Sequence, residues 1–266
     1  MTGQQTRFSR RRILAGTGVA VIGSLAGCSS ARSNESDGAN TVGDSGQTSR
    51  NGPTTGGESG AGSASLVNAG SGTTGYDVSV DGNAIIGQPD ATADLYYWSD
   101  YQCPFCKRFE EGAFPKLLEN EVADGELRIV PLSLPNIGQA SWNAAVMARC
   151  VWKDVRDTRP AAFVDWHRAV FDAQGEPNSG WASAEKLLSI TESVDGADAN
   201  AVESCYSGDN ADELDTIRSE RQRAGESGVG VTPGFVAYGR DTDRSGKLTG
   251  AQPYERFSKA VETVTE

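Results

Sequence analysis

The spacing of apolar positions changes several times along the C-terminal three quarters of the chain, and each change predicts a new element. Residues 76–80 alternate like a short strand, and the apolar runs at 84–86 and 93–98 are typical of strands. Apolar residues then recur at helical spacing over residues 107–122, and residues 127–132 give another strand pattern. This part of the sequence therefore predicts strands, one helix and a further strand.

Residues 138–227 are predicted to be almost entirely helical. The expected helices cover residues 141–153, a segment that begins at Pro160, and residues 181–190, 197–206 and 210–226. Strand patterns return at 235–238 and 247–249, before a last helix over 253–265. The order βαβ, helical insert, ββα predicts one mixed α/β domain (76–137 and 228–266), interrupted by a helical insertion (138–227).

Residues 29–75 consist mainly of Gly, Ser and Thr, and no aromatic residue occurs between Phe8 and Tyr76. Such a segment cannot bury enough apolar surface to offset the entropy that it would lose on ordering. We therefore expect residues 29–75 to form a disordered tether. A coil of this length has a root-mean-square span of about 40 Å, enough to hold a domain clear of a surface.

Residues 1–28 have the pattern of an export signal. Arginines at positions 10–12 precede an apolar run over residues 13–27. That run is shorter than the roughly 20 residues that a membrane-spanning helix needs, so we expect a signal rather than a permanent span. The paired arginines resemble the twin-arginine (Tat) signal, which exports proteins already folded.

The apolar run ends in LAGC, residues 25–28, which resembles a lipobox. In a lipobox the cysteine, here Cys28, is lipidated and becomes the new N-terminus. The alternative is an ordinary cleaved signal with an accidental cysteine. The place of Cys28 directly after the run favours lipidation. We therefore expect a mature chain outside the cytoplasm, anchored to the outer face of the cell membrane.

The formal net charge of −12 argues against nucleic acid as a partner, because a phosphate backbone would be repelled. Only six of the 24 basic residues are lysines. An acid-rich, lysine-poor surface is typical of proteins that stay hydrated in concentrated salt, so we expect a halophilic protein. A merely acidic, soluble protein is the alternative.

The cysteines stand at positions 28, 103, 106, 150 and 205. With Cys28 assigned to the lipid, four remain, an even number as expected of an exported protein. Cys103 and Cys106 lie three residues apart at a predicted helix start, so their side chains can meet. That leaves Cys150 and Cys205 for a structural disulfide within the helical insertion. The alternative is two separately buried thiols.

A CxxC sequence at the start of a helix is suited to thiol chemistry. The thiolate is the reactive form of cysteine, and the unpaired N–H groups and partial positive charge of a helix N-terminus stabilise it. Pro104 fits the first helical position because it has no N–H. We expect Cys103 to be exposed and to act as the nucleophile, and the more buried Cys106 to resolve or form the mixed disulfide.

A metal site is the competing interpretation of the cysteines. Zinc sites of the ribbon type need two close pairs of ligands, but Cys150 and Cys205 are far apart. Copper sites favour Met and His near the motif, and after the signal the chain offers only Met147 and His167. We therefore expect neither a metal nor a cofactor.

Two motifs together carry a family resemblance. The stretches SDYQCPFC (99–106) and GVTPGF (230–235) resemble the DsbA-like thiol:disulfide oxidoreductases of the thioredoxin fold, over about residues 76–266. The resemblance implies a thioredoxin-like fold with a helical insertion domain. It also implies a cis peptide bond before Pro233, which faces the cysteines, and a backbone at Thr232 that pairs with bound peptide.

The resemblance assigns Pro104 and Phe105, between the cysteines, to the substrate-binding surface. The strongest oxidants of the family carry histidine at the position of Phe105, so we expect a less oxidising protein, and the direction of electron flow stays open. His167 is expected to be a packed or surface helix residue rather than a base. Asp100 is either a proton acceptor near the buried sulfur or a cap of the helix or loop.

Residues 241–246 begin like a calcium-binding loop. The twelfth position of that loop is Gln252, where such loops carry a bidentate Glu. A hairpin turn is therefore the expected structure.

The sequence thus predicts a membrane-tethered thiol:disulfide oxidoreductase. Its substrates would be exported proteins or peptides with thiols or disulfides, and it would need a redox partner that the sequence does not identify. The alternative function is a non-catalytic thioredoxin-like module that binds proteins or peptides beside an inert disulfide. A metal carrier is a third, less favoured interpretation.

Overall fold

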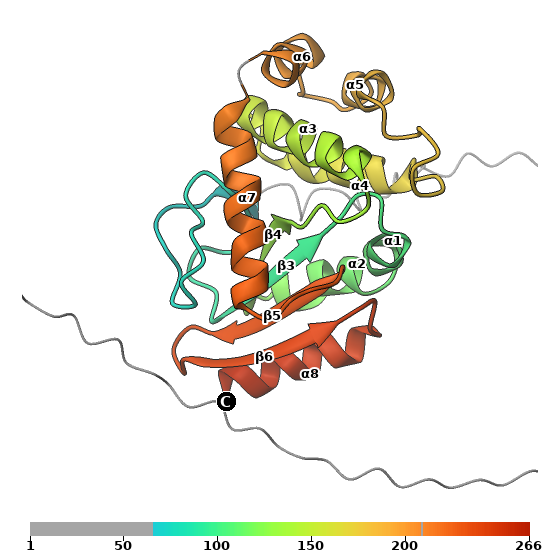
Figure 1. Cartoon of the computed structure of the whole chain (residues 1–266). Helices are drawn as coiled ribbons and strands as arrows, with labels where there is room; N and C mark the ends of the chain where they lie inside the picture. The colour runs from blue at the N-terminus through green and yellow to red at the C-terminus, as the bar shows by residue number, and fades with distance from the viewer. Residues whose placement is uncertain (1–65, 209) are drawn as a thin grey trace, which may run out of the picture. The chain divides into compact units, whose positions relative to one another are not determined.

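The computed structural model describes residues 66–208 and 210–266 (Figure 1). The strands are β1 (Val67–Ala69), β2 (Ala84–Ile86), β3 (Ala93–Ser99), β4 (Leu127–Ser133), β5 (Gly234–Gly239) and β6 (Arg244–Thr249). The helices are α1 (Pro104–Glu111), α2 (Ala113–Leu117), the π-helical turn η2 (Leu118–Val122), α3 (Gln139–Val155), α4 (Ala161–Asp172), α5 (Ala184–Glu192), α6 (Ala199–Ser207), α7 (Ala211–Glu226) and α8 (Tyr254–Thr265).

The predicted signal over residues 1–28, with Cys28, lies outside the described residues, as does the predicted tether up to residue 65. Within the two described ranges, no helix is long and apolar enough to cross a membrane.

The six strands form one mixed sheet in the order β1-β2-β4-β3-β5-β6. β3 runs parallel to β4 and antiparallel to β5, and the remaining neighbours are antiparallel. All seven residues of β3 are buried, which fits its central place and its continuous apolar sequence. The βαβ and ββα units are those that the sequence predicts, so the thioredoxin-like fold class is confirmed.

Successive side chains of β3 point to opposite faces of the sheet, and each face has its own core. On one face Tyr97 packs with Phe109 and Phe235, and these two rings also pack with Phe257, with ring centroids 4.7–5.1 Å apart in these pairs. Aromatic pairs at this separation stabilise a core by about 1 kcal/mol beyond burial alone. On the other face Trp98 lies under α7 and donates from Nε1 to the carbonyl of Glu220 at 3.0 Å. Both faces of the central strands are therefore covered.

The helical insertion shares its core with the sheet. α3 lies at the centre of the insertion, and α5 and α6 lie on its far side from the sheet (Figure 1). Buried residues of α3 and α4, such as Met147 and Trp166, belong to the same apolar cluster as Tyr97 and Phe109. The insertion therefore folds onto the thioredoxin-like part rather than beside it.

The folded part begins earlier than residue 76. β1 pairs with β2 through the register Val67↔Ile86, and Val67 is buried. Residues 66–75 therefore do not belong to the predicted tether. Residues 76–80 form turns and one isolated bridge at Ser79 instead of the predicted strand, although Val80 does enter the core. β1 has only three residues and lies among Gly and Ser residues, so its sequence has no clear strand pattern.

The helix predicted over residues 107–122 is interrupted. α1 ends before Gly112, and α2 and η2 follow it. The interruption has a local cause, because Pro115 has no N–H, and in a continuous helix its ring would clash with the carbonyl four residues earlier. Phe114 and Leu117 remain buried on either side of Pro115, so the break keeps both on the core.

Candidate active site

The two cysteines of the CxxC motif lie at the start of α1, a few residues after the end of β3. Cys103 is the N-cap residue of α1, with extended backbone angles, and Pro104 occupies the first turn. The carbonyl of Cys103 accepts hydrogen bonds from the N–H groups of Cys106 (3.0 Å) and Lys107 (3.2 Å). Pro104 has no N–H, so the N–H of Phe105 remains in the first turn, and together with the N–H of Cys106 it helps to stabilise an anion at the sulfur.

Cys103 is less exposed than the sequence suggests. Only 4% of its surface is accessible, against 0% for Cys106, so the expectation of an exposed nucleophile is wrong. The backbone of Thr232 lies against the sulfur. The side-chain amide of Gln174, just after α4, donates to the carbonyls of Cys103 (3.2 Å) and Tyr101 (2.6 Å), which holds this loop against the motif.

The thiols of Cys103 and Cys106, both free in this structure, differ sharply in acidity. The hydrogen bond from the Cys106 side chain lowers the pKa of Cys103 to about 6. The Thr232 side chain and the N–H groups of Phe105 and Cys106 lower it further, whereas burial acts to raise it. Burial raises the pKa of Cys106 well above its ordinary value, and the neighbouring Cys103 adds to this. At neutral pH the pair therefore holds one thiolate, at Cys103, and one thiol, at Cys106.

The segment before β5 faces the cysteines. The peptide bond between Thr232 and Pro233 is cis, and the Cys103 thiol, when protonated, donates to the carbonyl of Thr232 at 3.3 Å. Gly234 follows, where an added Cβ would lie 2.8 Å from the carbonyl oxygen of Val231. Only glycine therefore fits the tight approach of this segment to the start of β5.

Two large apolar side chains stay exposed beside the buried sulfurs. Phe105 is 50% exposed and Val231 is 53% exposed. Pro104 is exposed as well, and the guanidinium of Arg108 lies over the Phe105 ring, 4.8 Å from its centroid. The surroundings of Cys103 thus offer an apolar surface with a positive charge at its edge.

Asp100 organises the loops around the motif. Its Oδ1 accepts the N–H of Gln102 at 2.8 Å, and its Oδ2 accepts the N–H groups of Asn136 (2.7 Å) and Ile137 (3.0 Å). The side chain is buried, and these backbone donors occupy both oxygens. Of the two roles considered for Asp100, the structure favours the cap of a loop.

A buried polar chain behind the motif was not anticipated from the sequence. His167 of α4 receives or gives hydrogen bonds at both ring nitrogens, to the hydroxyl of Tyr101 (Nδ1, 2.8 Å) and to the Oε1 of Glu110 (Nε2, 3.0 Å). All three side chains are buried. The interpretation of His167 as a packed helix residue agrees with its burial, but its two polar partners could not be read from its own neighbours in sequence.

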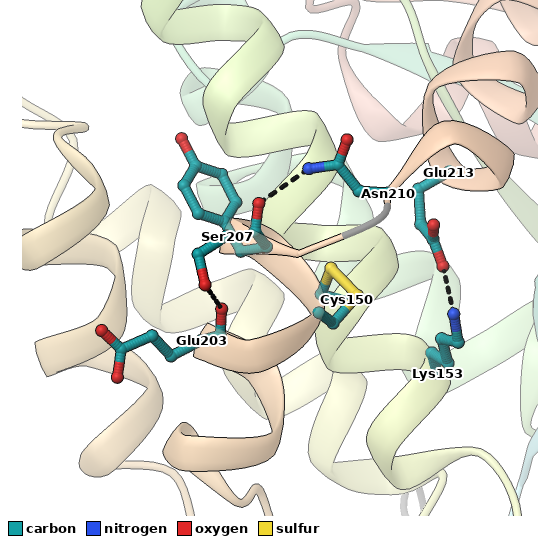
Figure 2. Close-up of a disulfide and its surroundings, with 8 residues drawn as sticks. Cys150, Lys153, Glu203, Ser207, Asn210 and Glu213 are labelled. Carbon is teal, nitrogen blue, oxygen red and sulfur yellow. Dashed lines mark hydrogen bonds and ion pairs between the residues drawn. A yellow bond between two sulfur atoms is a disulfide. The ribbon is translucent and has the colours of Figure 1, made fainter.

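The other two cysteines lie in the insertion, away from the motif. Cys150 of α3 and Cys205 of α6 form a disulfide, with their Cα atoms 5.7 Å apart (Figure 2). Nearby, Lys153 donates to Glu213 at 2.8 Å and ties α3 to α7. The disulfide thus closes a loop of 55 residues within the helical insertion.

No group of three or more His, Cys, Asp or Glu side chains in the described part of the chain is arranged to hold a metal ion. Residues 240–243 form the turn between β5 and β6, so a hairpin is confirmed here, but residues 244–246, expected to belong to the turn, are already part of β6. Asp243 accepts a hydrogen bond from the hydroxyl of Tyr238 at 2.8 Å within this hairpin.

A thioredoxin family model matches residues 79–263, which include the motif, the insertion and the cis proline. The chain belongs to the thioredoxin family. This family assignment accounts for the strand order and for the place of the CxxC motif at the start of α1.

Curated relatives of this thioredoxin family member match over a shorter stretch. Disulfide bond formation protein D of Bacillus subtilis is 28% identical over 116 residues, which is 44% of this chain and 50% of the relative. The probable disulfide bond formation protein D of Bacillus anthracis is 24% identical over 105 residues, 40% of this chain and 46% of the relative. The chain thus spans about half the length of the curated relatives that it matches.

Solved structures show the same fold. BdbD from Bacillus subtilis in its oxidised form superposes with a TM-score of 0.60 at 21% identity, over 74% of this chain and 98% of that one. Alpha-DsbA1 from Wolbachia pipientis superposes with a TM-score of 0.57 at 20% identity, over 68% of this chain and 89% of that one.

Proposed function

We propose that this chain is a thiol:disulfide oxidoreductase that exchanges disulfides with exported proteins through Cys103 and Cys106. The observation that carries the proposal is the difference in acidity of the two sulfurs, with the pKa of Cys103 lowered to about 6 and that of Cys106 raised. In such a dithiol the first sulfur is a thiolate that can attack a disulfide, and the second stays a thiol until it resolves the mixed disulfide. The names of the curated relatives support the same chemistry.

In the oxidising direction a substrate thiolate attacks the sulfur of Cys103 in the Cys103–Cys106 disulfide. The S–S bond breaks, Cys106 leaves as a thiolate that takes up a proton, and a mixed disulfide joins Cys103 to the substrate. A second substrate thiolate then attacks the substrate sulfur of that bond. Cys103 leaves as a thiolate, and its low pKa makes it a good leaving group. The substrate is oxidised by two electrons and the enzyme is reduced.

In the reducing direction the same steps run backwards, with Cys103 as the attacking thiolate and Cys106 as the resolving thiol. Stabilisation of the Cys103 thiolate favours the reduced enzyme and therefore the oxidising direction. Phe105 weakens this preference relative to a histidine, because it offers neither a hydrogen-bond donor nor a charge. The reduction potential of the pair decides the direction, with about 30 mV for each tenfold change in the equilibrium constant.

Substrate binding is assigned to the segment around Pro233 and to the residues between the cysteines. The backbone of Thr232 would pair with an extended peptide, and the exposed side chains of Phe105 and Val231 would contact its apolar residues. Pro104 lies exposed at the same surface. Because Cys103 itself is nearly buried, a flexible or unfolded substrate segment is better suited to reach it than a folded surface.

The proposed place of action rests on the sequence features before residue 66. The Tat-like arginines, the lipobox with Cys28 and the Gly- and Ser-rich tether support a domain held outside the cytoplasm on the outer face of the cell membrane. The disulfide between Cys150 and Cys205 is suited to an oxidising compartment. The acidic, lysine-poor composition supports action in concentrated salt.

Trapping of mixed disulfides tests the proposal. In the Cys106→Ala variant, Cys103 should remain linked to substrate proteins, which are then released by a reductant and identified by mass spectrometry. The matched control is the Cys103→Ser, Cys106→Ala double variant, in which the linked proteins should disappear. If instead the Cys103→Ser variant keeps the full biological function of the wild type, the non-catalytic binding module is the correct interpretation and the oxidoreductase is rejected.

A further inference from the structure

We infer that Gln174, a residue of the helical insertion, makes the cysteine pair more oxidising by donating hydrogen bonds to the carbonyls of Tyr101 and Cys103. The inference rests on the proposed function, because it concerns the balance between the dithiol and the disulfide of the same pair. It adds to the site a residue that lies 71 positions from Cys103 in the chain and outside both sequence motifs.

The side chain of Gln174 reaches the backbone of the motif itself. Its Nε2 donates to the carbonyl of Tyr101 at 2.6 Å and to that of Cys103 at 3.2 Å. An amide nitrogen carries two hydrogens, so one side chain serves both carbonyls. The Cys103 carbonyl also accepts the N–H groups of Cys106 and Lys107. Gln174 therefore adds a donor from outside α1 to the residue that carries the nucleophilic sulfur.

A second hydrogen bond holds the loop that carries Gln174. This loop joins α4 to α5, and within it the N–H of Asn178 donates to the Oε1 of Gln102 at 2.7 Å. Gln102 is 0% exposed, and its Nε2 has no hydrogen-bond partner among the described residues. A buried amide group without a partner is costly, so the one contact that Gln102 does make calls for a reason. That contact fixes the loop, and with it Gln174, beside residues 101–103.

The loop is also ordered by its own packing. Trp181 is 7% exposed, and a Cβ added to Gly175 would lie 3.3 Å from its side chain. The side chain of Asn178 lies against Gly138, just before α3. The amide of Gln174 is therefore held in place before the sulfur changes its charge, and its effect on the thiolate needs no rearrangement.

The sulfur of Cys103 responds to the carbonyl of its own residue. Four covalent bonds separate the sulfur from the carbonyl oxygen, so the two atoms are never more than about 5 Å apart. The oxygen is the negative end of the peptide dipole and disfavours a thiolate, and a donor on that oxygen offsets this effect. Gln174 has no hydrogen bond to the sulfur, so it is a positioning residue that acts through the backbone of Cys103.

The stabilisation acts on only one of the two redox states. The disulfide carries no charge, so donors around Cys103 stabilise the reduced protein, in which that sulfur is a thiolate. Phe105, between the cysteines, offers no hydrogen-bond donor. Gln174 supplies donors near the same sulfur from a different element. How oxidising the pair is therefore depends on the docking of the helical insertion as well as on the motif.

The titratable groups around the motif and the loop include Asp100, Tyr101, Lys107, Glu110, Glu111, His167, Asp172 and Glu176. Lys107 donates to the carbonyl of Asp172 at 3.1 Å and lies 3.8 Å from a carboxylate oxygen of Glu111. Substitutions at position 174 leave all of these groups in the chain. A fixed salt concentration keeps the screening of the exposed ones constant, so differences between variants report position 174.

The test compares the wild type with Gln174→Leu, which keeps the approximate size of the side chain and removes the donor. The ultraviolet absorbance of the thiolate in the reduced protein is followed against pH, and the ratio of dithiol to disulfide is measured in glutathione buffers. We expect the ratio of thiolate to thiol at a given pH to fall about fourfold. The balance with glutathione should shift by about the same factor toward the disulfide, so the variant is less oxidising.

Two further substitutions separate this role from a merely structural one. Gln174→Glu has no donor and carries a negative charge, so it should shift both quantities in the same direction as Gln174→Leu, by about tenfold or more. Gln174→Lys keeps a donor and adds a positive charge, so it should shift them the other way. Gln222→Leu is the matched control, because Gln222 is an exposed glutamine of α7, and it should behave as the wild type. Loss of packing alone would not make Lys and Glu act in opposite directions.

The inference is overturned if Gln174→Leu keeps both the wild-type thiolate midpoint and the wild-type balance with glutathione. It is also overturned if Gln174→Lys and Gln174→Glu shift these quantities in the same direction. Urea unfolding shows which variants are folded, and the Lys and Glu variants decide if Gln174→Leu is not. A wild type whose Cys103 titrates as an ordinary thiol, or that does not exchange with glutathione, would reject the proposed function instead, so the two failures are distinguishable.

Discussion

The sulfur of Cys103 lies 3.3 Å from the carbonyl oxygen of Thr232, although 129 residues separate the two in the chain. The sheet brings them together. β3 and β5 pair with Trp98 opposite Gly234, so the end of one strand and the start of the other meet at the same edge. The helical insertion between them is long, but it leaves and rejoins the sheet at this place. The sheet register therefore sets the geometry of the cysteine pair and its binding segment.

Replacement of Phe105 by histidine should make the protein more oxidising. Phe105 is half exposed, so the change leaves the core intact, and it adds a hydrogen-bond donor and a partial positive charge near the Cys103 thiolate. We expect the pKa of Cys103 to fall below about 6, by about one unit, and the reduction potential to rise by about 30 mV. Equilibration with glutathione buffers measures the potential. Phe105→Ala, which removes the ring without adding a donor, should stay near the wild-type value.

Removal of the disulfide in the insertion should lower stability without affecting exchange. The Cys150–Cys205 bond closes a loop of 55 residues, and the restriction of the unfolded chain then contributes roughly 4 kcal/mol. The Cys150→Ala, Cys205→Ala variant should therefore unfold at a clearly lower urea concentration. Its rate of exchange under folding conditions should match the wild type. An unchanged urea midpoint would show that α3 and α6 are held together by packing alone.

Asp100→Ala should destabilise the protein through its loops. The three backbone N–H groups that Asp100 accepts would lose a charged partner in a buried place, at a cost of about 3 kcal/mol. Urea unfolding measures this cost. The comparison is Asp165→Ala, which removes an exposed carboxylate of α4 and should change stability by less than about 0.5 kcal/mol. A wild-type midpoint in Asp100→Ala would reject the role as a loop cap.

The low pKa of Cys103 should appear in the pH dependence of stability of the reduced protein. Its pKa is about 6 in the folded state and about 8.5 in an unfolded chain, so folding favours the thiolate. This contribution is fully present above pH 8.5 and is lost as the pH falls through about 6. Relative to Cys103→Ser, the reduced wild type should gain on the order of 3 kcal/mol as the pH rises through this interval. A constant difference between the two proteins would contradict the assigned pKa.

The sequence predicts those elements whose pattern lies within the element itself. The continuous apolar run of β3 predicts a buried strand, and the run is buried throughout. The CxxC motif carries its own helix start, with Pro104 in the first turn. β1 was missed because only one residue of this three-residue strand, Val67, is buried. β1 is a strand because it pairs with β2, and this pairing cannot be read from the few residues around β1 alone.

The polar groups of the site could not be predicted for a similar reason. Glu110 looks like one more charged residue on an amphipathic helix, and His167 is a lone histidine with no motif around it. Their contact depends on how α4 docks against α1. The near burial of Cys103 likewise depends on the close approach of Thr232 and Gln174, which lie far from it in the chain. Cys150 and Cys205 could be bonded or separate until the places of α3 and α6 were known.

The rate at which Cys103 is alkylated, measured against pH with mass spectrometric assignment of the modified residue, tests the central claim most directly. The account predicts that iodoacetamide modifies Cys103 with a midpoint near pH 6 and leaves Cys106 unmodified at neutral pH. Cys106→Ala should move the midpoint upward, because the hydrogen bond from Cys106 is the largest cause of the low pKa. A midpoint of about 8.5 in the wild type, as for an ordinary free thiol, or a Cys103 that does not react at all, would contradict it.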